Sequence, residues 1–175
     1  DWYLNKEKVT KNSFKEEFNY VFSPLLKKFA DLPQVLVHRD YHIDNLFYLA
    51  KRKKILRCGL IDYQDAVIGP CVYDLVSLTQ DARIDIPKQL ESHLIKYYLE
   101  NNNYIDKELF RYCYNIMAIQ RHLKVLGIFS RLSIRDNKKQ YLNHLPRVKN
   151  LLFINLQQNN FKKLSPILLP LIKND

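Results

Sequence analysis

Two polar side chains within residues 38–45 could carry out chemistry together. Residues 38–45 read H-R-D-Y-H-I-D-N, which has the pattern H-R-D-x-x-x-x-N. A hydroxyl that attacks a phosphoryl group needs a carboxylate beside its proton, and a magnesium ion must lie on the phosphate side. The pattern therefore predicts a phosphoryl-transfer loop with Asp40 as the catalytic base and Asn45 as a metal ligand.

A second carboxylate follows at the end of an apolar segment. Residues 59–65 read G-L-I-D-Y-Q-D, so that a short apolar strand would deliver Asp62 at its end. In kinases this place belongs to the magnesium-binding aspartate of D-F-G, although Gln64 here replaces the glycine. Because magnesium commonly takes only one or two protein oxygens, we expect Asn45 and Asp62 to hold Mg²⁺ against the nucleotide phosphates.

Each of these residues also has a plain structural interpretation. Asp40 could form an Asx-turn in a surface loop, and Asp62 could be a turn residue that ends a strand. We expect His38 to brace the loop by a hydrogen bond rather than to carry chemistry. His42 beside Asp44 could suggest a metal pair, but loop polarity explains it, and the other histidines share no zinc-ligand spacing.

A third motif, Gly69-Pro70-x-x-Tyr73-Asp74-Leu75, follows the first two. In this order the three motifs resemble the aminoglycoside phosphotransferase and choline kinase-like superfamily, while the D-F-G and A-P-E of protein kinases are absent. The stretches 120–132 and 141–148 narrow the resemblance to the anomeric N-acetylmuramate and N-acetylglucosamine kinases of bacterial cell-wall recycling. The resemblance runs from about residue 2 to about residue 148.

This resemblance implies an α+β fold, namely the mostly helical C-terminal lobe of a protein-kinase-like fold with a small β-hairpin region that carries the catalytic loop. We interpret residues 1–175 as a single domain, with a catalytic and metal segment at 35–78 and a helical substrate segment at 87–157. The resemblance also implies that Asp74 is a buried carboxylate that accepts N–H groups of the catalytic loop. It further implies ATP as co-substrate, Mg²⁺ as cofactor and a small sugar or amino alcohol as phosphate acceptor, an amino sugar being preferred.

Three residues are candidates for the sugar side of the pocket. Asp65 lies just past the expected metal carboxylate. Arg121 and Arg131 are ten residues apart on an expected helix, which is nearly three turns and places them on roughly one face. An arginine fork would suit the lactyl carboxylate of N-acetylmuramate. Solvated helix charges would explain the same two arginines.

The family is bilobal, and this chain lacks the features of the N-terminal lobe. It has three glycines, none of them clustered, and no lysine in a V-A-I-K-like context before His38. We therefore expect a fragment, a processed product or one half of a split protein, with an N-terminal lobe on a separate chain as a partner. The alternative function is an incomplete or split-kinase module that has no activity without that lobe.

Composition limits the other classes of function. The net charge is +10, with basic clusters at 51–54, 138–139 and 162–163. A nucleic-acid-binding protein typically has basic residues clustered with aromatic ones. Here only the net charge supports nucleic-acid binding, so we do not expect a nucleic-acid partner. The three cysteines form no C-x-x-C, which predicts buried, reduced thiols in a cytoplasmic protein. No apolar run is long enough to span a membrane.

Apolar spacing predicts the elements that position the site. A capping box at Ser13 begins a helix that Pro24 kinks and that ends near 31–33. A buried strand at 35–37 leads into the catalytic loop, and a hairpin joins strands at 46–49 and 55–61 around the basic turn. We expect this small sheet to place the three catalytic and metal residues on one rigid base.

The remainder is predicted to be helical. Helices are expected near residue 73, from Pro87 to about 101, over 107–131 and over 137–155. Pro146 is expected to kink the last of these, and two further prolines, at 166 and 170, to break up the tail.

Overall fold

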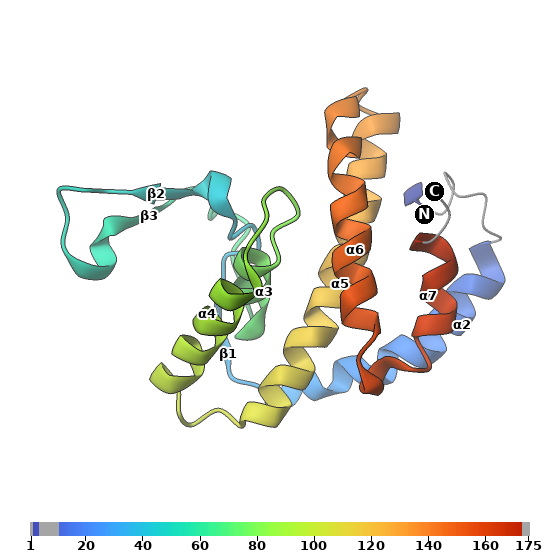
Figure 1. Cartoon of the computed structure of the whole chain (residues 1–175), viewed down its shortest axis with the longest axis horizontal. Helices are drawn as coiled ribbons and strands as arrows, with labels where there is room; N and C mark the ends of the chain where they lie inside the picture. Colours follow the sequence, from blue (N-terminus) through green and yellow to red (C-terminus); the bar gives the residue numbers. More distant parts are fainter. Residues whose placement is uncertain (1, 4–10, 173–175) are drawn as a thin grey trace. The chain divides into compact units, whose positions relative to one another are not determined.

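The computed structural model describes residues 2–3 and 11–172, and it is mostly helical with two small antiparallel sheets (Figure 1). This confirms the predicted α+β class. Residues Phe29–Tyr114 form one compact unit, and the described residues before and after them form a second. The single domain over 1–175 therefore stays a prediction, and each unit is described by itself.

The unit formed by Phe29–Tyr114 contains all the strands of the described chain. The unit begins within the 3₁₀ turn η1 (Lys27–Asp31). Its further elements are β1 (Gln34–Val37), η2 (Ile43–Asn45), β2 (Leu46–Tyr48), η3 (Lys54–Arg57), β3 (Cys58–Leu60), β4 (Val67–Pro70), α3 (Val72–Thr79), α4 (Lys88–Asn101) and the start of α5 (Lys107–Ile134).

The strands form two separate pairs rather than the single small sheet that was predicted. In one pair β1 runs antiparallel to β4, with Val37 opposite Val67. In the other β2 runs antiparallel to β3, with Leu46 opposite Leu60, which confirms the predicted hairpin. The strand expected over 55–61 is shorter, because the turn η3 occupies its first half.

Two predictions about burial in this unit were wrong. The strand at 35–37 is only partly buried, because Val37 faces the core while Leu36 is 72% exposed. Cys58 is exposed, whereas Cys71 and Cys113 are buried as expected. Cys58 lies opposite Tyr48 in the two-stranded β2–β3 sheet, to which no third strand is paired among the described residues.

The helices α3, α4 and α5 begin close to their predicted positions. Pro87 is the N-cap residue of α4, which fits a residue that has no N–H to donate. Along α5 the predicted apolar face is largely buried: Phe110, Tyr114, Met117 and Leu126 are at most 5% exposed. Leu123 is only half-buried.

The second unit contains α2 (Lys11–Leu26), the rest of α5, η4 (Lys139–His144), α6 (Leu145–Leu156), η5 (Asn159–Phe161) and α7 (Ser165–Ile172). The predicted face of α2 is its more buried one, and Phe18 stacks on Phe22 with ring centroids 4.8 Å apart. The capping box predicted at Ser13 involves a side chain outside the described set.

The prolines of this unit act differently from the prediction. Pro146 lies in the first turn of α6 and begins a new helix after η4, rather than kinking one continuous helix, because the first turn needs no N–H donor. Pro166 and Pro170 lie within α7 and do not break it. Burial of Leu168 and Leu171 holds this short helix in place.

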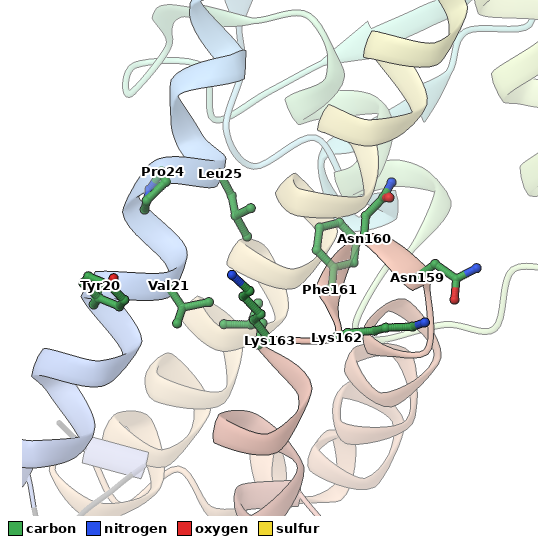
Figure 2. A pocket seen from close by; sticks show the side chains of 10 residues that line it. Tyr20, Val21, Pro24, Leu25, Asn159, Asn160, Phe161, Lys162 and Lys163 are labelled. Atoms are coloured by element: carbon green, nitrogen blue, oxygen red, sulfur yellow. The ribbon is translucent and has the colours of Figure 1, made fainter.

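A pocket of about 530 Å³ lies in this second unit between α2 and the segment 159–164 (Figure 2). The residues that line it from α2 are Tyr20, Val21, Pro24 and Leu25. None of the residues predicted to bind metal or substrate lines it. The predicted catalytic and metal residues Asp40, Asn45 and Asp62 lie in the other unit.

Among the described helices, none combines the length and the apolar character that crossing a bilayer requires.

The buried His122 on α5 makes a prediction about acid stability. Burial, and to a smaller extent the positive charge of the neighbouring Arg121, lowers the pKa of His122 to about 3. The unfolded chain binds this proton near pH 6.5, so between these values it holds more protons than the folded chain. The free energy of unfolding should therefore fall below pH 6.5, with a slope of up to about 1.4 kcal/mol per pH unit.

Urea unfolding between pH 7.5 and pH 5 measures this slope. His122→Gln should reduce it, whereas His93→Gln, which replaces an exposed histidine on α4, should not. Equal slopes for the unsubstituted chain and the His122→Gln variant would contradict the assignment.

Candidate active site

The catalytic loop begins where β1 meets the first turn of α3. The Asp74 carboxylate accepts the backbone N–H of His38 at 2.6 Å through Oδ2 and that of Arg39 at 3.1 Å through Oδ1. Arg39 has a φ of 75°, in the left-handed region that non-glycine residues rarely adopt. Both carboxylate oxygens are thus used to fix a strained turn immediately before Asp40.

Ile61 joins this loop to the segment that ends in Asp62. The Nε2–H of His38 donates to the carbonyl oxygen of Ile61 at 2.9 Å. The N–H of Ile61 donates to the carbonyl oxygen of Asn45 at 3.2 Å. Both polar backbone groups of the residue before Asp62 are therefore bonded to the loop that contains Asp40. The structure brings the Asp40, Asn45 and Asp62 segments together within one unit.

The side chain of Asn45 reaches back across the same loop. Its Nδ2 donates to the carbonyl oxygen of Asp40 at 2.9 Å, and the residue is only 8% exposed. This bond engages the nitrogen end of the amide and leaves its oxygen as the group of the kind that binds magnesium. The Asp40 residue itself is half-buried.

Asp62 is exposed and has a φ of 65°, again in the left-handed region. Its Oδ1 accepts a hydrogen bond from Nε2 of Gln64 at 2.6 Å. The departure from D-F-G thus has a local consequence, because Gln64 restrains the carboxylate two residues before it. Strained backbone of this kind is concentrated at functional sites in proteins.

The candidate substrate residues lie in both units. Asp65 is exposed, and its backbone carbonyl accepts a bond from Nη1 of Arg39 at 3.2 Å, which ties the segment after Asp62 to the loop. Arg121 and Arg131 are half-buried residues of the second unit. Their contribution to a sugar pocket stays a prediction.

Sequence reasoning missed Asp81, which is 2% exposed and accepts the N–H of Ile43 at 3.4 Å. Asp81 belongs to none of the three motifs, and only its position two residues after the end of α3 could have indicated a role in the site. Its neighbour Arg83 places Nε 3.2 Å from the carboxylate of Asp44. Burial lowers the pKa of His42 in this region, and the charge of Arg83 lowers it further.

Within the described residues no three His, Cys, Asp or Glu side chains are grouped so that they could hold a metal ion. The predicted pair of one amide and one carboxylate still fits magnesium, which leaves most of its coordination to phosphate and water. Its donor atoms are oxygens, as this ion requires.

The profile of the phosphotransferase enzyme family matches residues 3–109, which contain all three motifs. The chain therefore belongs to this family, as the motifs predicted.

Its curated relatives include proteins named N-acetylmuramate/N-acetylglucosamine kinase. The relative from Neisseria meningitidis is 33% identical over 176 residues, which cover 95% of this chain and 50% of that protein. Those from Caulobacter vibrioides and Pseudomonas putida are 33% and 34% identical and cover 75% and 84% of this chain, against 36% and 44% of their own lengths. The chain thus spans about half, or less, of the length of these relatives.

The double acceptor at Asp74 makes a prediction about the loop. Asp74→Ala leaves the N–H groups of His38 and Arg39 without their acceptor, and we expect a loss of about 1–3 kcal/mol in the free energy of unfolding. Amide hydrogen exchange at these two residues should also become faster. Urea unfolding and exchange followed by NMR measure both effects.

Asp106→Ala is the matched control, because Asp106 accepts the N–H of Leu109 at 2.6 Å at the start of α5, in the same unit. It should lower stability without changing exchange at His38 and Arg39. Unchanged protection of these amides in the Asp74→Ala variant would show that the carboxylate does not hold the loop.

Proposed function

We propose that the protein carries the catalytic loop and the metal-binding residues of an ATP- and Mg²⁺-dependent phosphotransferase. The reaction would transfer the γ-phosphoryl group to a hydroxyl of a small molecule, an amino sugar such as N-acetylmuramate or N-acetylglucosamine. The observation that carries this proposal is the pair of bonds on Ile61, which join the Asp40 loop to the Asp62 segment. The names of the relatives support the choice of sugar.

Asp40 would act as the base or as the residue that orients the acceptor hydroxyl. The transition state of phosphoryl transfer is loose and needs little early deprotonation, so positioning is the larger part of this role. The bond from Asn45 to the Asp40 carbonyl and the bonds from Asp74 to the preceding turn support such a fixed position. His38 would brace the loop through Ile61.

Asn45 and Asp62 would hold Mg²⁺, with phosphate and water as the remaining ligands. When bound, the ion neutralises charge that develops on the transferred group. The engaged nitrogen of the Asn45 amide and the restrained, exposed carboxylate of Asp62 support this assignment.

Asp65, Arg121 and Arg131 complete the proposal on the acceptor side. Asp65 would accept hydrogen bonds from sugar hydroxyls, and an arginine would pair with a lactyl carboxylate through two parallel N–H···O bonds. A cytoplasmic location, where ATP is available, belongs to the same proposal.

Transfer of labelled γ-phosphate tests this function directly. The chain is completed with an N-terminal lobe in trans and supplied with either sugar, and we expect Mg²⁺-dependent labelling of the sugar. Asp40→Asn should reduce the rate about 10²–10⁴-fold while leaving the folded state intact. Glu100→Gln, on the exposed surface of α4, should retain full activity.

Two results would overturn parts of this proposal. Absence of transfer to both sugars by a folded, completed protein removes the amino-sugar acceptor. An Asp40→Asn variant with the unsubstituted rate removes the role of that carboxylate.

A specific observation favours the second candidate, a module that is inactive without a partner lobe. Many large apolar side chains between residues 36 and 68 are exposed: Leu36, Phe47, Tyr48, Ile55, Leu56, Leu60, Ile61, Tyr63, Val67 and Ile68. A two-stranded hairpin alone is marginally stable in water, and exposed apolar groups of this extent mark interaction sites. The β2–β3 hairpin extends away from α3 and α4 of its own unit (Figure 1).

Substitutions on the hairpin test this candidate. Ile55 is 85% exposed and Leu56 is 62% exposed, so the Ile55→Ser/Leu56→Ser variant should fold normally. Its affinity for an N-terminal lobe polypeptide, measured by titration calorimetry, should fall about 10–100-fold because two apolar contacts are lost. Ile134→Ser, at the end of α5, is the control.

Equal affinity of the two variants would place the partner elsewhere. Phosphate transfer by the chain alone at ordinary kinase rates of about 1–100 s⁻¹ would exclude the partner-dependent module altogether.

A further inference from the structure

Two carboxylates, one in the first turn of α3 and one just beyond its end, both contact the catalytic loop. Asp74, in the first turn of the helix, holds the N–H groups of His38 and Arg39. Asp81, two residues beyond the helix, accepts the N–H of Ile43 through Oδ2. The loop is therefore bonded to a single helical segment on both sides of Asp40.

The Asp81 carboxylate is buried, with its side chain only 1% exposed. A buried charge is costly unless it is paired and hydrogen-bonded. The Oδ1 atom accepts the backbone N–H of Arg83 at 2.8 Å, and the Nη1 atom of Arg83 lies 3.8 Å from it. Arg83 thus provides both a hydrogen bond and a compensating charge.

Arg83 also reaches the catalytic loop itself. Its Nε lies 3.2 Å from Oδ2 of Asp44, the residue before Asn45. The bond from Asp81 to the N–H of Ile43 is long at 3.4 Å, so this ion pair supplies a second attachment beside it. Together they hold residues 43 and 44, while Asp74 holds residues 38 and 39.

We propose that Asp81, paired with Arg83, is a positioning residue that fixes the second half of the catalytic loop and so determines where Asn45 presents its amide oxygen. This inference rests on the proposed function, in which Asn45 binds the metal. Removing a residue that orients a metal ligand without touching the metal typically lowers metal affinity about 10–100-fold.

Amide hydrogen exchange of the whole chain, followed by NMR, tests the attachment without any assay of activity. Asp81→Asn keeps the shape of the side chain and one acceptor oxygen but removes the charge that pairs with Arg83. Exchange at Ile43 and Asn45 should become about tenfold faster, which corresponds to the loss of one charge-assisted hydrogen bond. Exchange at Arg39, which Asp74 holds, should not change.

Mn²⁺ serves as a paramagnetic probe of the metal position. In the unsubstituted chain, it should broaden the amide signals of Asn45 and Asp62. In the Asp81→Asn variant, about tenfold more Mn²⁺ should be needed for the same broadening at Asn45. Asp106→Asn, which removes a charge from a side chain that accepts a backbone N–H elsewhere in the unit, should behave like the unsubstituted chain.

Each result has a separate meaning. Unchanged exchange at Ile43 and Asn45 overturns the attachment by Asp81. Faster exchange with unchanged Mn²⁺ affinity overturns its role in placing Asn45. Absence of Mn²⁺ broadening in the unsubstituted chain overturns the metal site of the proposed function and this role with it, whatever the exchange data show for the loop.

Discussion

The site depends on the backbone of Ile61, whose two polar groups are both bonded to the catalytic loop. Asp40 follows β1, which pairs with β4, whereas Asp62 follows β3, which pairs with β2. The two sheets are separate, so no strand ladder fixes one carboxylate relative to the other. The ring of His38 and the carbonyl of Asn45 provide that connection. A histidine in a motif often suggests chemistry, but here its geometry serves to join two small sheets.

The same region contains two non-glycine residues in the left-handed conformation. Arg39 and Asp62 have φ values of 75° and 65° and stand beside the proposed base and at the proposed metal ligand. Such conformations cost about 1–3 kcal/mol each and persist only where surrounding bonds enforce them. Asp74 enforces the first, through bonds to two consecutive N–H groups. These two strained residues therefore lower the stability of the folded chain, while they fix the backbone next to Asp40 and at Asp62.

Much of the fold could be predicted from the sequence because it depends on local sequence patterns. The hairpin, the starts of α4 and α5 and the family follow from spacing, proline position and motif order. The strand β4 and the exposure of Cys58 could not be predicted, because they depend on which segment pairs with which and on what covers the pair. Asp81 was missed for a related reason, since a carboxylate after a helix is ordinary until its distance to the loop is known.

The helix α7 continues through Pro170, although proline in a helix was predicted to break it. Pro170 removes one backbone donor, and a rule based on sequence treats that loss as decisive. In the folded chain the neighbouring Leu168 and Leu171 are buried, and their packing outweighs a single missing bond. Local rules fail where tertiary burial is large compared with the local penalty.

The β2–β3 hairpin has one consequence for how activity could be controlled. Its outer end bears uncovered apolar side chains, and the strand that returns from it leads directly to Asp62. Any protein that covers that end would also restrict the motion of the carboxylate. Docking and metal affinity would then be thermodynamically linked, so that each strengthens the other by the same factor. Under the proposed function, the chain would therefore bind Mg²⁺ more tightly with that end covered than it does alone.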